Sequence, residues 1–77
     1  MPSATGTIAL NNFLQARRKL ASLSWNDTTS GPAHAPQWLS VCKIDGKDIS
    51  SGTGTHKHFS RDVAAERALA ILTAEWA

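Results

Sequence analysis

The stretch IDGKDISSGTGTHKHFSRDVAAERALAILTAEW, residues 44–76, decides the fold. Its Asp45-Gly46 pair is a strong signal for a tight hairpin turn, so the residues before it and the segment 47–51 are expected to pair as antiparallel strands. Residues 56–76 contain neither Gly nor Pro and are rich in Ala, Leu, Glu and Arg, which predicts a long helix. The sequence therefore predicts a hairpin followed by a helix.

The segments upstream of the hairpin turn extend the predicted sheet. Residues 38–44 alternate with the period of a strand, with Trp38, Ser40, Cys42 and Ile44 on one face and Leu39, Val41 and Lys43 on the other. Residues 23–30 begin with strand formers around Trp25 and continue with Asn, Asp, Thr and Ser, which predicts a short strand running into a loop. Residues 31–36 hold two prolines and a glycine and predict a stiff, exposed loop.

An amphipathic helix is expected before these strands. Thr7 is a suitable N-cap, and apolar residues recur with helical spacing at Ala9, Phe13, Ala16 and Leu20, with Leu10 and Leu14 alongside. The opposite side carries Ile8, Asn12, Gln15, Arg18 and Lys19. Residues 1–7 are small and polar, so we predict a flexible segment over 1–7 and one domain over 8–77.

The predicted order is helix, three antiparallel strands, helix. Two layers form only if both helices cover one face of the sheet, because a sheet must bury its apolar face against another element. We therefore predict an α+β fold, α-β-β-β-α, with two helices on one face of a three-stranded antiparallel sheet.

Composition sets outer limits on function. The 77 residues carry a net charge of only +2, so the placement of the charges matters more than their sum. The single cysteine, Cys42, excludes an internal disulfide framework and is expected to be a small core residue. No apolar stretch approaches the length that spans a bilayer. We expect an intracellular protein, in the cytoplasm or the nucleus, with no membrane or small-molecule partner.

The start of the second helix gathers positive groups. Lys57, His58 and Arg61, the basic turn, are spaced so that they share a helix face. Free backbone N–H groups at a helix start attract anions, and Gly52-Thr53-Gly54-Thr55 would let the chain approach a phosphate closely. An ordinary solvated helix turn explains the same residues equally well, so the pattern alone leaves both interpretations open.

The order of elements and three motifs together resemble the double-stranded RNA-binding domain, from about Ile8 to Ala74. The motifs are Leu10-Asn11-Asn12 with Gln15, the loop Gly31-Pro32-Ala33-His34-Ala35-Pro36 with Trp38 after it, and Gly52-Thr53-Gly54 leading to Lys57-His58-Phe59-Ser60-Arg61-Asp62-Val63-Ala64-Ala65. The loop and the alanine-rich helix are the specific parts.

The resemblance implies three contacts with duplex RNA and no catalysis. The first helix would contact one minor groove through Ile8, Asn12 and Gln15, and the loop would enter the next through Pro32, Ala33 and His34. The basic turn, Lys57, His58 and Arg61, would bind the phosphates between them. Such domains cover about 16 base pairs and recognise 2′-hydroxyls and phosphates more than base identity.

The chain departs from the family pattern at three positions. Asn12 stands where the family usually has Glu, so an ionic acceptor is lost while hydrogen bonding remains. His58 replaces a Lys, so a permanent cation becomes a group that titrates near pH 6.5. The aromatic residue of the first strand, Trp25, lies one residue nearer the loop, which predicts a trimmed strand or loop.

Metal binding and catalysis lack the residue patterns that they need in this sequence. His56 and His58 lack the second close ligand pair that zinc requires, and no acidic cluster could hold magnesium, so we expect no metal, no cofactor and no enzyme activity. Trp25 and Trp38 are expected in the core rather than as stacking platforms. An alternative function is self-association or docking on an RNA-processing protein, through Leu39, Val41, Phe59 and Val63.

Overall fold

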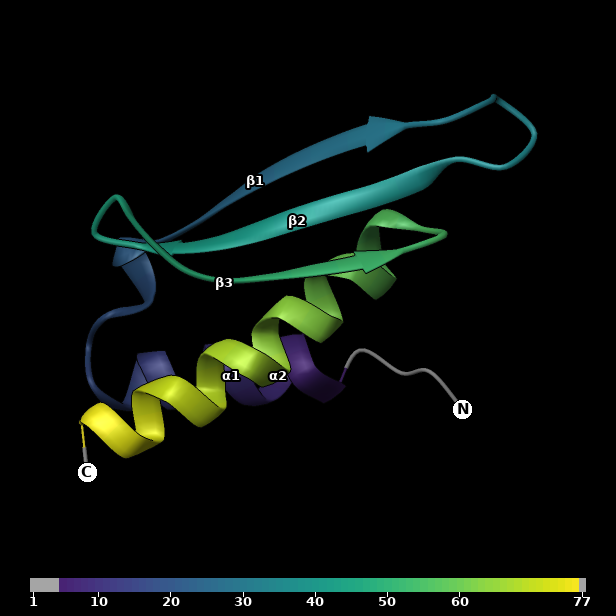
Figure 1. The fold of residues 1–77 in the computed structure, drawn as a ribbon. Coiled ribbons are helices and arrows are strands. Elements are labelled where there is room, and N and C mark those ends of the chain that lie inside the picture. Colours follow the sequence, from purple (N-terminus) through teal and green to yellow (C-terminus); the bar gives the residue numbers. More distant parts are fainter. Residues whose placement is uncertain (1–4, 77) are drawn as a thin grey trace.

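The computed structural model describes residues 5–76 and confirms the predicted fold (Figure 1). The elements run α1 (Thr5–Ala16), a short 3-10 turn η1 (Leu20–Ser22), β1 (Leu23–Ser30), β2 (Gln37–Ile44), β3 (Lys47–Gly54) and α2 (Lys57–Glu75). The three strands form one antiparallel sheet in the order β1-β2-β3, and both helices lie on the same side of it.

The strand register sets rows of side chains that face the helices. Trp25 pairs with Cys42 and Asp27 pairs with Ser40, which in turn pairs with Gly52 on β3. Ser40, Cys42 and Ile44 are buried, which confirms the predicted inner face of β2. A bulge between Cys42 and Lys43 shifts the register toward the β2–β3 turn.

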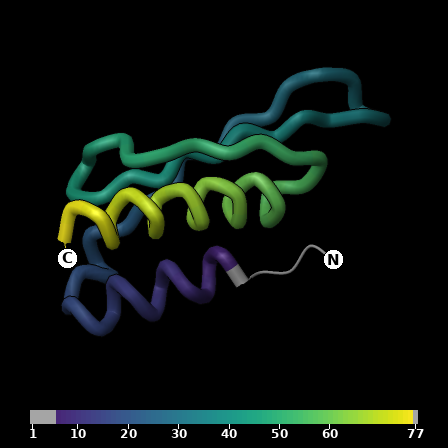
Figure 2. The backbone as a smooth tube through the Cα atoms, turned by 60° about the horizontal axis from the view of Figure 1, so that its bottom comes forward, coloured from purple at the N-terminus to yellow at the C-terminus, as the bar shows by residue number. Residues whose placement is uncertain are grey.

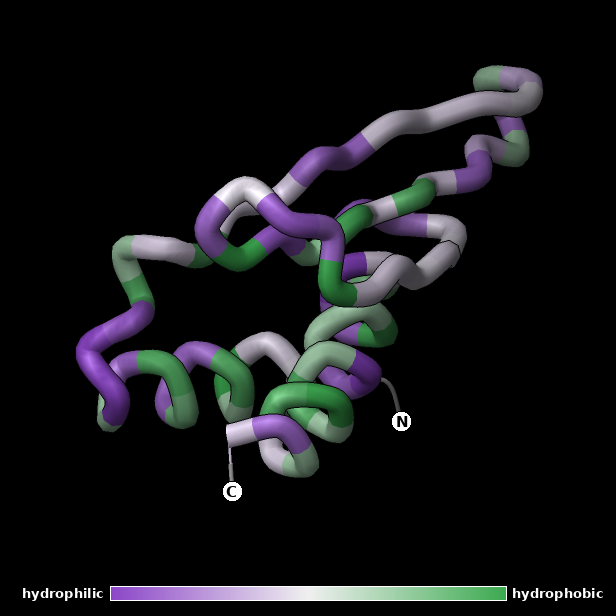
Figure 3. The backbone as a smooth tube through the Cα atoms, turned by 60° about the vertical axis from the view of Figure 1, so that its left-hand side comes forward, coloured by the Kyte–Doolittle hydropathy of each residue, from purple (hydrophilic) through white to green (hydrophobic). Residues whose placement is uncertain are grey.

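Strand β1 is longer than predicted. It spans eight residues and pairs with β2 as far as Ser30, so it does not end in a loop soon after Trp25. Figure 3 shows pale and hydrophilic colours along most of this strand. The polar residues of β1 form a strand because they pair with β2, and this pairing, with the partial burial of alternate side chains, outweighs their weak intrinsic preference for a strand.

The core lies between the sheet and the helices. Helix α2 lies between the sheet and α1, as Figure 2 shows, so α1 reaches the core along its flank. The buried apolar residues are Leu10, Leu14, Cys42, Ile44, Ala64, Ala65, Ala68 and Leu72. Small alanines on α2 allow the helix to approach the sheet closely, and the leucines of α1 fill the remaining space. The burial of Cys42 confirms its predicted role as a core residue.

The inner face of α1 differs from the predicted one. Leu10 and Leu14 are fully buried, whereas Ala9 and Ala16 are exposed and Phe13 is only partly buried. Both sets have helical spacing, and the position of α2 decides between them. Phe13 instead stacks on Trp76, with ring centroids 5.8 Å apart.

Both ends of α1 also differ from expectation. The helix begins at Thr5, so Thr7 is not its N-cap; the Thr7 backbone N–H and hydroxyl both donate to Asp62 of α2. Of the segment expected to be flexible, residues 5–7 are helical and residues 1–4 lie outside the described part of the chain. The helix ends at Ala16, because Arg18 takes a positive φ of 58° and the Lys19 N–H donates to the Leu14 carbonyl.

Gly52 serves packing, which corrects its predicted role in phosphate approach. A Cβ at Gly52 would lie 2.5 Å from the Ser60 carbonyl oxygen and 2.6 Å from the Ala64 nitrogen, so the bare face of this glycine meets the backbone of α2. A Cβ at Gly54 would lie 3.0 Å from the Cβ of Phe59. The glycines of β3 therefore fix how closely α2 approaches the sheet.

Within residues 5–76, neither helix combines the length and apolarity needed to cross a membrane.

Candidate nucleic-acid interface

The β1–β2 loop, the start of α2 and the first turn of α1 lie toward one end of the molecule, and the α1 contacts continue from Ile8 along the helix toward the other end, where Lys19 pairs with Asp45 at 3.4 Å. Figures 1 and 2 place the β1–β2 loop and the first turns of α1 and α2 together, opposite the β2–β3 turn. The molecule measures 41 Å in its longest dimension. Segments 8–15, 32–34 and 57–61 can therefore face one extended ligand.

On α1 the predicted residues form an exposed stripe. Ile8 is 55% exposed, and Asn12 and Gln15 are also exposed. The three residues follow one another at spacings of four and three, so their side chains lie on one face of the helix. An apolar tip followed by two amides offers van der Waals contact and both hydrogen-bond donors and acceptors.

The β1–β2 loop projects beyond the helices, as Figure 1 shows. Pro32, Ala33 and His34 are exposed, and the Ala35 N–H donates to the Pro32 carbonyl at 3.0 Å, which closes a tight turn. Gly31 has a φ of 88°, in the left-handed region that glycine adopts without strain. The loop is thus an exposed projection, closed by a tight turn, that carries an imidazole near its tip.

The first turn of α2 presents Lys57 and His58 to solvent. The Lys57 Nζ lies 5.7 Å from the centre of the Trp38 ring, and Lys57 forms no ion pair with any residue in the range 5–76. His58 stacks on His56 with ring centroids 5.6 Å apart and lies 4.3 Å from Phe59. A free ammonium group and two exposed imidazoles therefore surround the free N–H groups of the helix start.

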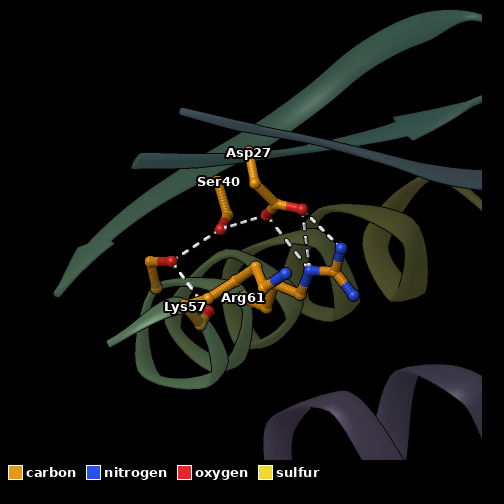
Figure 4. Close-up of polar contacts among 5 residues, drawn as sticks. Asp27, Ser40, Lys57 and Arg61 are labelled. Atoms are coloured by element: carbon orange, nitrogen blue, oxygen red, sulfur yellow. Dashed lines mark hydrogen bonds and ion pairs between the residues drawn. The ribbon is translucent and has the colours of Figure 1, made fainter. Parts of the chain in front are cut away.

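Arg61 does not point outward with these groups. Its Nε donates to both carboxylate oxygens of Asp27 at 3.1 Å, and its Nη2 forms a further ion pair with Asp27 Oδ2 (Figure 4). The guanidinium also lies 5.5 Å from the Trp25 ring. The three members of the basic turn are therefore not equivalent, because the guanidinium of Arg61 is paired with Asp27 of β1, whereas Lys57 and His58 are exposed without an acidic partner within residues 5–76.

The ion pair continues into a buried hydrogen-bond chain. Ser40 Oγ donates to Asp27 Oδ1 at 2.6 Å and lies 2.6 Å from Ser60 Oγ, which lies 2.8 Å from the Lys57 carbonyl oxygen. An ionised carboxylate only accepts and a hydroxyl carries one proton, so Ser60 donates either to Ser40 or to Lys57. This chain, the Asp27 network, joins β1 and β2 to the first turn of α2.

Hydrogen bonding with Arg61 holds the pKa of Asp27 below its ordinary value, against the opposing effect of burial. The Ser40 hydrogen bond and the positive charges of Arg61 and Lys57 lower that pKa further. Asp27 is therefore a carboxylate at neutral pH. Elsewhere, burial raises the pKa of Cys42 to about 11, which keeps this core thiol protonated.

Comparison with known proteins identifies the family. A family model described as "Double-stranded RNA binding motif" matches residues 9–72. The chain belongs to the double-stranded RNA-binding motif family. It is also 36% identical over 61 residues to Ribonuclease 3 of Streptococcus thermophilus, an alignment that covers 79% of this chain and 27% of that relative. The family is a binding motif, and the chain corresponds to about a quarter of the relative.

Sequence reasoning missed three residues of this double-stranded RNA-binding motif. Asp27, Ser40 and Ser60 form the Asp27 network; Asp27 and Ser40 belong to no motif that the sequence suggested, and Ser60 lies within the third motif without a predicted role. Asp27 follows Trp25 on the inner face of β1, and an inward carboxylate on a strand requires a charged partner. The inward position of Asp27 in the strand alternation was the sequence signal that a cation should lie opposite it on the facing helix.

The possible protein interface does not form one surface in the motif. Leu39 and Val41 alternate with the buried Ser40, so they lie on the sheet face away from the helices. Phe59 and Val63 lie on α2, where their Cβ atoms lie beside Gly54 and Gly52 of β3. Trp25 packs against the core as predicted, whereas Trp38 is half-buried beneath Lys57.

Proposed function

We propose that this chain binds A-form duplex RNA by shape, with contacts from α1, the β1–β2 loop and the start of α2, and that it does so without catalysis. The observation that carries the proposal is that, in a double-stranded RNA-binding motif, the β1–β2 loop and the start of α2 lie at the end where α1 begins, and the exposed stripe of α1 continues from there along the helix. The hydrolytic activity implied by the relative's name is a property of that protein, of which this chain matches 27%.

Each segment has a role suited to its chemistry. Ile8, Asn12 and Gln15 contact 2′-hydroxyls and base edges in one minor groove, and Pro32, Ala33 and His34 enter the next, because the narrow major groove of A-form RNA excludes side chains. Lys57 and His58 bind the phosphates between the two grooves. The exposure of all eight residues leaves them free to make these contacts.

Gel-shift titrations with duplex RNA, duplex DNA of the same sequence and single-stranded RNA test the function. We expect the duplex RNA to bind most tightly, with an affinity that falls steeply as salt rises, because phosphate contacts release counterions. Equal binding to duplex DNA, or binding that does not respond to salt, contradicts the proposal.

Asn12 and Gln15 should contribute preference for RNA over DNA. Replacing either with Ala should lower the ratio of RNA to DNA affinity by about threefold, the value of one net hydrogen bond. Asn26→Ala is the matched control, because Asn26 is exposed on the outer side of β1. An unchanged ratio in Asn12→Ala and Gln15→Ala places these residues outside the interface.

His58→Lys should bind duplex RNA about fivefold more tightly than the parent at 0.15 M salt, because it places a permanent cation beside the proposed phosphate and so adds one contact. His58→Gln, which keeps a hydrogen-bond donor without adding a charge, is the comparison and should show no such gain. Gel-shift titrations of both variants measure the effect. A His58→Lys affinity equal to that of the parent rules out His58 as a phosphate contact.

A further inference from the structure

Asp27 lies close enough to Lys57 for the ammonium charge to act on its carboxylate, and its position is unusual for a strand residue. It faces α2 from the inner side of β1, and its side chain is only 12% exposed, whereas that of Arg61 is 36% exposed. Nε and Nη2 of Arg61 and the hydroxyl of Ser40 all point at this one carboxylate (Figure 4). The negative charge is thus fixed beneath the helix start.

This geometry neutralises one cation of the basic turn. Arg61 and Asp27 together carry no net charge, and the mostly buried carboxylate is screened less by salt than an exposed one would be. The charge of Lys57 also acts on Asp27, so the field of the carboxylate extends to the ammonium group that remains free. A phosphate that approaches the helix start meets Lys57 and the imidazoles, opposed by Asp27.

We propose that Asp27 weakens duplex RNA binding by neutralising Arg61 and partly offsetting Lys57, so that the affinity of this chain is set by an acidic residue outside the contact surface. This inference rests on the proposed function. Since the carboxylate acts through Arg61 and Lys57 and touches no RNA, Asp27 is a positioning residue and an electrostatic restraint on the basic turn.

Asp27→Asn tests the inference, because Asn keeps an oxygen acceptor for Ser40 and Arg61 while it removes the charge. We expect it to bind duplex RNA about fivefold more tightly than the parent at 0.15 M salt, with a salt slope steeper by about 0.9, the signature of one added phosphate contact. If the ion pair between Asp27 and Arg61 only stabilises the fold, Asp27→Asn should leave the salt slope unchanged or bind RNA more weakly than the parent.

Asp48→Asn is the matched control. Asp48 pairs with Lys43 at 3.5 Å near the β2–β3 turn, at the opposite end of the sheet from the helix starts, and its removal adds the same net charge. We expect its affinity to change by less than about twofold, since the added charge lies beyond a Debye length from the phosphates. If Asp27→Asn binds no more tightly than Asp48→Asn, the inference is wrong.

A double variant keeps the test decisive if Asp27→Asn alone does not fold. Asp27→Asn with Arg61→Gln replaces the ion pair by two neutral amides and conserves the net charge. We expect the parental salt slope, whereas a slope lower by about 0.9 would mean that Arg61 binds a phosphate in spite of Asp27 and would overturn the inference. If the parent protein does not bind duplex RNA, the proposed function is wrong and the variants test nothing further. If the parent binds duplex RNA, the outcomes above test the role of Asp27 alone.

Discussion

Gly52→Ala should lower the free energy of unfolding by about 3 kcal/mol, at the upper end of the usual cost of overpacking a core. The added Cβ would lie 2.5 Å from the Ser60 carbonyl oxygen and 2.6 Å from the Ala64 nitrogen, two backbone atoms of α2 that cannot rotate away. Relief therefore requires α2 to move away from β3, which also strains the contact between Ser40 and Ser60 in the Asp27 network.

Thermal unfolding measures this effect directly. For a domain of this size, about 3 kcal/mol corresponds to a fall in Tm of roughly 12–24 °C. Thr53→Ala is the control, because Thr53 is the next residue along β3 and is exposed on the other face; we expect a change within about 0.5 kcal/mol. A Gly52→Ala protein that melts within about 3 °C of the parent would show that the sheet and α2 have room to separate.

The position of Gly52 also shows why its role could not be predicted from the sequence. The Gly52-Thr53-Gly54 motif indicates that another group approaches the backbone closely, but the sequence does not show whether that group is a phosphate or another part of the chain. The register of β3 on β2 places Gly52 beside Ser40, and α2 then lies across that row. The close approach is to a helix, which only the packed sheet reveals.

The helix and strand pattern was largely predictable because it depends on local signals. The Asp45-Gly46 turn, the alternation of β2 and the absence of Gly and Pro after His56 each act within a few residues. In contrast, the inner face of α1 depends on where α2 packs, since Ala9 and Leu10 begin two equally periodic sets. The extent of β1 likewise depends on its pairing with β2.

The candidate interface was predictable in its segments and not in its electrostatics. The family pattern marks Lys57 and Arg61 as similar cations, and their helical spacing supports that interpretation. The structure distinguishes them, because Asp27 lies 34 residues before Arg61 in the chain and adjacent to it in space. A pairing across that separation has no sequence signal beyond the inward phase of Asp27.

Lys57→Glu should weaken duplex RNA binding about 30-fold at 0.15 M salt, the largest effect expected from a single surface substitution. Each lost phosphate contact costs about fivefold under these conditions, and charge reversal removes one attraction and adds one repulsion of similar size. Lys57 is the residue to change because it forms no ion pair within residues 5–76, so its charge is available to the RNA.

The measurement is a set of gel-shift titrations at several salt concentrations, with thermal unfolding of each variant to verify folding. Lys57→Ala should show an intermediate loss of about fivefold and a salt slope shallower by about 0.9. Lys47→Glu is the matched control: Lys47 is exposed beside the β2–β3 turn, at the end of the molecule opposite the β1–β2 loop and the start of α2, so the same charge reversal should change the affinity by less than about twofold. Equal losses in Lys57→Glu and Lys47→Glu would mean that net charge alone governs binding and that the start of α2 holds no phosphate. A loss confined to Lys57→Glu places the phosphate backbone at this helix start, since screening by salt limits the reach of an exposed charge to about 8 Å at this ionic strength.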